Sequence, residues 1–288
     1  MEFQQMRYVI AVAEERSFTR AAERCLVVQS ALSHQIKALE RELGVRLFAR
    51  TSRRVEITAA GEAFLVQARA SLAAAERAMS EAAAAGGRIS GTLTVGVIPT
   101  VTAIDIPSVL GRFHRAHPDV RIRLRGGGSD EFIAAIVAGS MDVAVLGLPD
   151  SIPPKGVNAR VLAREQLVAV VAAEHLLAGR RRLSLEELAG EAFVDFPEGT
   201  PGRVQSDLAF EAAGVHREVM FEAMNTDLIL DLIRQGLVIS LLPPALLSSG
   251  VDGLRTVPVA DGPSRVEYLA WSSFNPAPAA QAFLDGLA

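Results

Sequence analysis

Apolar side chains in the first 60 residues recur at helical spacing. Between Phe3 and Ala13 they repeat every three or four residues, which predicts an amphipathic helix. Ser17 and Thr19 offer hydroxyl oxygens that can begin a second short helix. A third apolar stripe ends before Gly44, a residue typical of a helix C-cap. The pattern therefore predicts three short helices in succession.

The third helix has two distinct faces. Its apolar stripe is formed by Ala31, Leu32, Ile36, Leu39 and Leu43. The outer face carries Gln29, Ser30, Ser33, His34 and Lys37. A basic turn over residues 50–54 and a short β segment at residues 55–58 come next. Three helices followed by a two-stranded basic turn predict a winged helix-turn-helix over residues 1–58.

A long helix is expected over residues 59–88. Residues 59–85 lack proline and are rich in alanine, which favours helix strongly. Large and small residues alternate along one seam at heptad spacing, a pattern typical of helix pairing. This helix has no partner within a 60-residue domain, so we expect the seam to form a dimer. The proposed dimer seam is Leu65, Ala68, Leu72, Ala75 and Met79.

The remainder of the chain, residues 89–288, alternates strand-like and helix-like segments. Strands at 92–98, 120–125 and 143–148 with helices at 101–116 and 130–138 predict a parallel βαβαβ unit. A second set follows, with strands at 167–172, 192–196, 219–223 and 238–242 and helices at 203–213 and 226–235. A late strand at 266–271 can return to the first set. We expect two α/β lobes, 89–163 with 264–288 and 164–263, with ligands bound between them at the carboxyl ends of the strands.

Composition and charge narrow the class of protein. Of the 288 residues 50% are hydrophobic, and the net charge is -4. Residues 1–60 nevertheless contain 10 Arg or Lys against 7 Asp or Glu, a local excess of +3 that suits a phosphate backbone. The single cysteine, Cys25, excludes an internal disulfide framework and a two-thiol peroxide sensor within one subunit. The chain begins without a basic, apolar leader, so we expect a soluble cytoplasmic protein that does not contact the membrane.

Residues 17–65 carry a recognisable signature, SFTRAAERCLVVQSALSHQIKALERELGVRLFARTSRRVEITAAGEAFL. This segment resembles the DNA-binding region of LysR-type transcriptional regulators, and the order of winged helix, long helix and two-lobed domain extends the resemblance over the whole chain. The resemblance implies a cytoplasmic DNA-binding regulator, commonly a tetramer built as a dimer of dimers, with RNA polymerase as a further partner. It also implies a C-terminal domain similar to periplasmic solute-binding proteins that senses a small-molecule effector.

Four positions depart from the pattern of this family. Cys25 and Leu26 replace the usual leucine and polar residue. Val28 stands where Ser or Thr usually caps the recognition helix, which forgoes a cap worth about 0.5 to 2 kcal/mol. His34 stands where arginine is common, so a fixed positive charge is exchanged for a side chain that is mostly neutral at pH 7.

Candidate DNA contacts lie on the third helix and the basic turn. The outer face of the helix offers hydrogen-bonding groups for base edges and phosphates, and the turn can hold phosphates or enter the minor groove. The predicted DNA-binding residues are Gln29, Ser30, Ser33, His34, Lys37, Arg50, Thr51, Arg53 and Arg54. Taken singly, each of these residues would be an ordinary solvated side chain.

Candidate effector contacts follow the predicted strands. The turn Thr100 to Thr102 is expected to open a helix, where hydroxyls and free N–H groups favour a small organic anion. The alternative for these residues is plain helix capping. The predicted effector-binding residues are Thr100, Val101, Thr102, Ser129, Leu146, Gly147, Phe196, Thr200, Arg203, Asn225 and Thr226.

Other functional classes find little support in the sequence. Neither a GxSxG elbow nor a P-loop nor an HExxH motif occurs, so we expect no enzyme and no cofactor. His114 and His117 lack a nearby third ligand, which argues against a metal site. The main rival is a solute-binding module that carries a helical oligomerisation segment and has no role at DNA.

Overall fold

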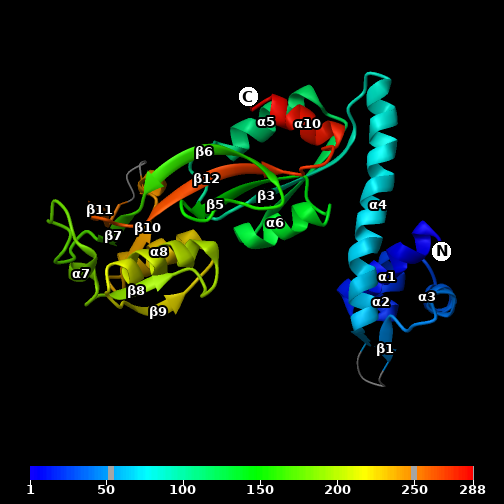
Figure 1. Ribbon diagram of the computed structural model, residues 1–288, viewed down its shortest axis with the longest axis horizontal. Helices are drawn as coiled ribbons and strands as arrows, with labels where there is room; N and C mark the ends of the chain where they lie inside the picture. Colours follow the sequence, from blue (N-terminus) through cyan, green and yellow to red (C-terminus); the bar gives the residue numbers. More distant parts are fainter. Residues whose placement is uncertain (51–54, 248–251, 288) are drawn as a thin grey trace. The chain divides into compact units, whose positions relative to one another are not determined.

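The computed structural model of the chain describes residues 1–50, 55–247 and 252–287 (Figure 1). The chain divides into two compact units. The first comprises Met1–Arg88 with the short turn Ala138–Ser140, and the second comprises Ile89–Val137 with Met141–Ala288. None of the described helices is long and apolar enough to cross a membrane.

The first unit contains three helices, a two-stranded wing and a long helix. Its elements are α1 (Phe3–Glu15), α2 (Phe18–Arg24), α3 (Gln29–Leu43), β1 (Phe48–Arg50), β2 (Val55–Ile57) and α4 (Ala59–Ala85). Ser17 caps α2 by accepting a hydrogen bond from the N–H of Arg20, as the sequence predicts. β1 pairs antiparallel with β2. Three helices and a two-stranded wing form the winged helix-turn-helix expected from the sequence.

The core of this unit differs in detail from the predicted stripes. Leu32, Ile36 and Leu39 of α3 are fully buried, as expected. Ala31 is exposed and Leu43 is 38% exposed, so the buried stripe of α3 is narrower than predicted. The buried stripe of α1 is rotated relative to the predicted one. Tyr8 is buried, whereas Phe3, which was expected in the stripe, is 51% exposed.

The long helix α4 begins by packing against its own unit. Thr58 caps it by accepting from the N–H of Gly61, and α1 lies against its N-terminal half. Leu65 packs on the core of the winged helix, and Ala68 is only 1% exposed. Ala68 is therefore covered within the single chain, whereas Leu65 is half-buried and keeps part of its surface exposed. Leu72 and Ala75 are half-buried, and Met79 is 66% exposed.

A shared carboxylate fixes α4 to the helix-turn-helix. Glu14 of α1 lies 2.7 Å from Arg24 of α2 and 2.9 Å from Arg69 of α4. Burial by itself would raise the pKa of Glu14, but the hydrogen bonds from the two arginines outweigh it and leave the pKa below its ordinary value. The ion pairs join three helices through one side chain.

The second unit begins with lobe I, a five-stranded sheet covered on both faces. Its strand order is β4-β3-β5-β12-β6, in which β3 pairs parallel with β4 and β5, and β12 pairs antiparallel with β5 and β6. The late strand therefore returns to the first lobe, as the sequence predicts. The elements are β3 (Gly91–Val97), α5 (Ile106–Ala116), β4 (Val120–Gly126), α6 (Ser129–Val137), β5 (Val143–Pro149), β6 (Asn158–Gln166), β12 (Ser264–Trp271) and α10 (Pro278–Asp285).

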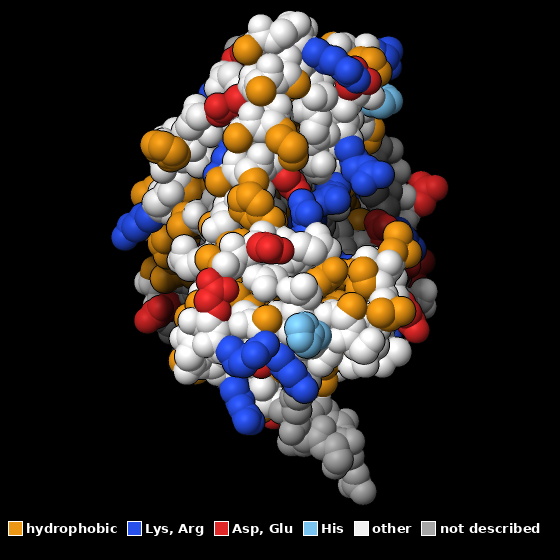
Figure 2. Space-filling view, turned by 90° about the vertical axis from the view of Figure 1, so that its right-hand side faces the viewer, with side chains coloured by type: hydrophobic (Ala, Val, Ile, Leu, Met, Phe, Trp, Pro, Cys, Tyr) orange, Lys and Arg blue, Asp and Glu red, His pale blue; other side chains and the backbone are white. Residues whose placement is uncertain are grey.

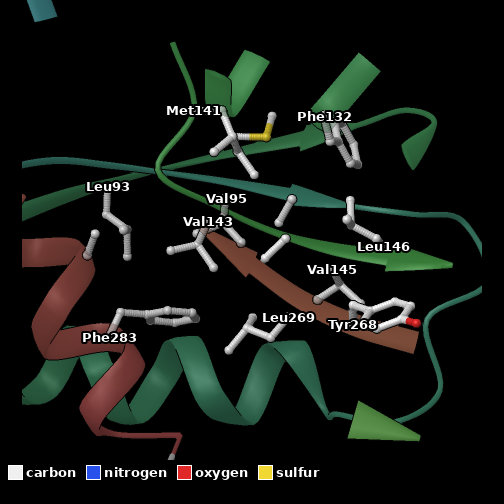
Figure 3. Close-up of a cluster of buried hydrophobic side chains, with 14 of the residues drawn as sticks. Leu93, Val95, Phe132, Met141, Val143, Val145, Leu146, Tyr268, Leu269 and Phe283 are labelled. Atoms are coloured by element: carbon white, nitrogen blue, oxygen red, sulfur yellow. The ribbon is translucent and has the colours of Figure 1, made fainter. Parts of the chain in front are cut away.

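The core of lobe I lies on both sides of this sheet. Figure 3 shows Phe132 and Met141 packed above the central strands, with Leu269 and Phe283 below them. α6 covers one face, and α5 and α10 cover the other (Figure 1). β5 is buried along its whole length, which explains its continuous apolar sequence.

Lobe II is built from smaller sheets with helices around them. β7 pairs antiparallel with β10 and β11, while β8 pairs parallel with β9. The strand pairing is therefore mixed. The elements are β7 (Val168–Ala172), α7 (Leu185–Leu188), β8 (Ala192–Asp195), α8 (Pro201–Ala212), β9 (Glu218–Glu222), α9 (Thr226–Arg234), β10 (Ser240–Leu242), the 3-10 helix η1 (Pro244–Leu247) and β11 (Leu254–Pro258).

Candidate functional site

The outer face of α3 is open to solvent. Gln29, Ser30, His34 and Lys37 are exposed, and Ser33 is half-buried. Val28 occupies the N-cap without a side-chain hydrogen bond, as its departure from the family pattern predicts. The exposed side chains combine amide, hydroxyl, imidazole and ammonium groups, which supply the donors and acceptors that base edges and phosphates require.

A basic groove continues from the C-terminal half of α3 towards the wing. Its volume is about 570 Å³, and its lining is His34, Lys37, Glu40, Arg41, Gly44, Val45, Arg46 and Phe48. The carboxylate of Glu40 accepts hydrogen bonds from the N–H groups of Leu47 and Phe48, at 2.9 and 3.2 Å. Glu40 therefore holds the turn between α3 and β1.

The cations of this groove remain available for an anionic partner. Within residues 1–50 and 55–88, neither Lys37 nor Arg46 forms an ion pair. Figure 2 shows Lys and Arg side chains gathered beside a histidine at the lower end of the face in view. Of the wing residues expected to bind DNA, the side chain of Arg50 and the whole of Thr51, Arg53 and Arg54 lie outside the described residues.

A narrow cleft separates the two lobes of the second unit. Its cavity of about 30 Å³ exceeds the roughly 10 to 15 Å³ that one water molecule requires. Lobe I lines it with Ile98, Pro99, Thr100, Gly127, Gly128, Ser129, Gly147 and Arg265. Lobe II lines it with Phe196, Thr200, Pro201, Gly202, Gln205 and Met224. Residues far apart in the sequence thus meet at one small cavity.

The turn Thr100 to Thr102 does not open a helix. α5 begins at Ile106, because Asp105 caps it by accepting from the N–H of Ser108 and a proline follows in the first turn. The N–H groups of Thr102 and Ala103 donate to the carboxylate of Glu267, at 3.0 and 3.1 Å. The expectation of free N–H groups at this turn was wrong, since an internal carboxylate occupies them.

The other predicted residues in lobe I differ in their access to the cavity. The hydroxyl of Ser129 donates to the carbonyl of Gly147 at 3.1 Å and accepts from its N–H at 3.0 Å. This pair joins the start of α6 to β5. Leu146 is fully buried in the core of lobe I (Figure 3), so its predicted place on the cleft wall was wrong. Adjacent residues of a strand point to opposite faces, which is why Gly147 lines the cleft and Leu146 does not. Val101 and Thr102 are half-buried and also lie outside the cavity lining.

The predicted residues in lobe II divide in the same way. Phe196 and Thr200 line the cavity, but the hydroxyl of Thr200 donates to the carbonyl of Pro197 at 2.7 Å. Arg203 does not line it. Its Nε lies 2.9 Å from Asp207 and its Nη1 3.2 Å from Glu222, so its charge is neutralised within lobe II.

The start of α9 contains one cap and one bridge between the lobes. Asn225 accepts a hydrogen bond from the N–H of Leu228, the plain capping role considered as an alternative. The hydroxyl of Thr226 donates to the carbonyl of Pro99 at 3.1 Å. Thr226 therefore connects lobe II to the end of β3 in lobe I.

Sequence reasoning missed two polar side chains that line the cavity, Gln205 and Arg265. Arg265 is a charged residue of β12 and yet only 2% exposed, and Gln205 on α8 is 7% exposed. The available signal for Arg265 was a charged residue next to the strand-like segment 266–271, which itself contains a second charged residue, Glu267. Gln205 gave no signal, because the side of α8 that faces the cleft depends on packing.

Comparisons with known proteins agree with this architecture. Residues 3–62 match the bacterial regulatory helix-turn-helix proteins of the lysR family, and residues 86–288 match the LysR substrate binding domain. This chain belongs to the LysR family of transcriptional regulators. Proteins of this family regulate transcription and are not enzymes.

Relatives of this LysR-family regulator span nearly its whole length. An uncharacterized HTH-type transcriptional regulator from Escherichia coli, YnfL, is 33% identical over 98% of this chain and 96% of its own. BudR from Raoultella terrigena is 30% identical over 99% of both chains. A hydrogen peroxide-inducible genes activator from Dickeya chrysanthemi is 32% identical over 84% of this chain and 79% of its own.

Full-length solved structures match this chain over nearly its whole length. A full-length OxyR variant from Pseudomonas aeruginosa matches with a TM-score of 0.74 and 28% identity, covering 100% of this chain and 94% of the other. CbnR in complex with its target DNA matches with a TM-score of 0.71 and 26% identity, covering 99% and 98%. The winged helix of the LysR-family regulator is thus a DNA-binding domain, joined to an effector-binding domain.

Proposed function

We propose that this regulator reads DNA with the outer face of α3 and that a small molecule bound in the cleft changes its effect on transcription. The observation that carries the DNA contact is the basic groove beside the exposed face of α3, where Lys37, Arg41 and Arg46 lie together. Phosphate contacts from this groove would supply affinity, and Gln29, Ser33 and His34 would read base edges.

Salt dependence tests this assignment. Fluorescence anisotropy with DNA from upstream of the gene would measure affinity between 50 and 200 mM salt. Removing one phosphate contact in Lys37→Ala should weaken binding and reduce the slope of log K against log salt by about 0.9. Lys155→Ala is the matched control, because Lys155 is the other lysine of the chain and is exposed in the second unit.

Two outcomes would count against the proposal. Equal affinity and equal slope for wild type and Lys37→Ala would remove the groove from the interface. Failure of the wild-type chain to bind any upstream DNA would favour the rival, a solute-binding module without a role at DNA. Ser33→Ala adds a second probe, with weaker sequence discrimination as the expected result.

The cleft supports the effector site in this proposal. Both lobes line it, and the hydrogen bond from Thr226 to Pro99 crosses it. A molecule in the cavity would alter this closure, and we propose that the change reaches the DNA as altered spacing of the two winged helices and altered bending.

Self-association completes the proposal. α4 extends about 40 Å at 1.5 Å per residue, and Met79 on its seam is 66% exposed. We propose a dimer through the later part of this seam and a tetramer from two such dimers. Action in the cytoplasm and contact with RNA polymerase follow from a role at promoters.

Peroxide sensing by a thiol pair is not part of the proposal. Some relatives are named hydrogen peroxide-inducible genes activators. The single cysteine of this chain, Cys25, packs against the core of the winged helix, and burial raises the pKa of its thiol despite the nearby Arg24. The second unit therefore has no cysteine with which to form a disulfide.

A further inference from the structure

The first turn of α3 exposes apolar side chains to solvent. Val27, in the turn before the helix, packs against the core of the winged helix. Val28, the N-cap of α3, is by contrast 69% exposed. Ala31, three residues further along the chain, is exposed as well, although the sequence pattern places it in the buried stripe. The core of the winged helix therefore makes little use of the valine at this end of α3.

A valine at the N-cap is unfavourable for the helix itself. Ser, Thr, Asp and Asn are preferred there, because a side-chain oxygen accepts a hydrogen bond from an N–H group of the first turn, which valine cannot do. Val28 makes no such bond, whereas Ser17 caps α2 and Thr58 caps α4. Neither capping nor burial accounts for Val28, so its apolar surface is available to a partner from outside the chain.

The location of Val28 identifies that partner as DNA. The winged helix is a DNA-binding domain, and in helix-turn-helix proteins the N-terminal residues of the recognition helix contact base edges in the major groove. Val28 directly precedes the exposed Gln29 and Ser30, and the cations Lys37 and Arg41 lie on later turns of the same helix. The apolar end of α3 is thus continuous with the polar and basic surface that DNA would cover.

Thymine is the base that presents an apolar group in the major groove. Its 5-methyl group projects there, while the other base edges offer hydrogen-bond donors and acceptors. A valine side chain can cover this methyl group but cannot form a hydrogen bond with a base edge or a phosphate. Contact between the two removes apolar surface of both from water, which favours binding.

We propose that Val28 contacts the 5-methyl group of a thymine in the operator and makes this regulator prefer thymine at that position. This inference rests on the proposed reading of DNA by α3. Val28 is a specificity-determining residue whose apolar contact forms only in the complex with DNA.

Replacing thymine with uracil tests the inference, since the two bases differ only in the 5-methyl group. The probe is the segment of DNA upstream of the gene that the full-length protein protects from hydroxyl radicals. Each thymine of this segment would be replaced in turn by deoxyuridine, and fluorescence anisotropy would measure the affinity of each duplex. Replacement of the contacted thymine should weaken wild-type binding by about 4-fold, as expected for one buried methyl group.

The variant Val28→Ser separates a methyl contact from a structural role. Serine removes the apolar group and supplies the missing cap, so the variant should unfold at the same temperature as wild type or higher. It should bind the thymine and uracil duplexes equally. Val137→Ser is the matched control, because Val137 ends α6 in the second unit and is 62% exposed, and it should keep the wild-type response to uracil.

The failure of this inference is distinguishable from failure of the proposed function. Equal affinity of wild type for every duplex, or the same loss on uracil replacement in Val28→Ser as in wild type, would overturn the methyl contact but keep α3 at the DNA. A lower unfolding temperature of Val28→Ser would show that the valine supports the fold and would also overturn the inference. If wild type bound no upstream DNA, the proposed reading of DNA would fail together with it.

Discussion

The guanidinium of Arg265 donates a hydrogen bond from Nη1 to the hydroxyl of Thr100, at 2.7 Å. Its Nη2 atom also donates to the carbonyl of Thr100, at 2.8 Å. The two residues are 165 positions apart, yet together they fix the turn after β3 against β12. Thr100 is therefore a structural residue of the cleft as well as a candidate ligand contact.

Thr100→Val should destabilise the second unit. Valine keeps the shape of threonine but leaves Nη1 of Arg265 buried without its hydroxyl acceptor, which costs about 1 to 3 kcal/mol. Urea unfolding would measure the loss, and Thr100→Ser should recover most of it. Thr256→Val on the exposed face of β11 is the control and should stay within about 0.5 kcal/mol of wild type. Equal unfolding midpoints for Thr100→Val and wild type would contradict the prediction.

Leu26→Asn should stabilise the first unit. Leu26 has a φ of 54° and is 92% exposed in the turn between α2 and α3. A left-handed backbone costs a leucine roughly 1 to 2 kcal/mol, whereas asparagine adopts it more readily, and almost no packing is lost. Thermal unfolding should show a gain for Leu26→Asn and little change for Leu176→Asn, a control at 95% exposure with an ordinary backbone. A loss in the first variant would show that Leu26 makes a contact that matters.

Asp195 should titrate far above an ordinary aspartate. Burial raises its pKa from 3.8 to about 6, even though Arg217 lies 2.7 Å away and favours the charged form. Between these two values the folded chain holds a proton that the unfolded chain has released. The stability contributed by this group is therefore present below about pH 4 and is lost as the pH rises through about 6.

Two measurements check this titration. Carbon-13 NMR of the carboxyl groups, assigned with Asp195→Asn, should show a midpoint near pH 6. The free energy of unfolding of wild type minus that of Asp195→Asn should fall between about pH 4 and 6 and then level off. A difference that rises with pH would mean that the ion pair with Arg217 outweighs burial.

Leu72→Glu should weaken self-association. A carboxylate within an apolar seam lacks a partner, at a cost of several kcal/mol. Sedimentation velocity should show smaller species for this variant, while Val66→Glu, a half-exposed position off the seam, should sediment as wild type. Circular dichroism would establish that α4 stays folded, and an unchanged oligomer in Leu72→Glu would place the seam against its own subunit.

The sequence determined the order of the elements because their signals are local. The recognition helix, the long alanine-rich helix and the alternation of strands and helices all follow from spacing and capping within a few residues. Ser17 and Gly44 cap helices where the sequence places them. The sequence also predicted that residues 264–271 return to lobe I, because an apolar β segment needs a sheet to join.

Only the tertiary structure decided which side chains face the cleft and what charge it carries. Glu267 and Arg265 neutralise the turn at Thr100 from a strand more than 160 residues away in the sequence, and no local pattern encodes that pairing. Gln205 lines the cavity because α8 turns this face towards it. Hydrogen bonds and desolvation depend on distances in space, so the chemistry of the ligand site appears only once the lobes are packed.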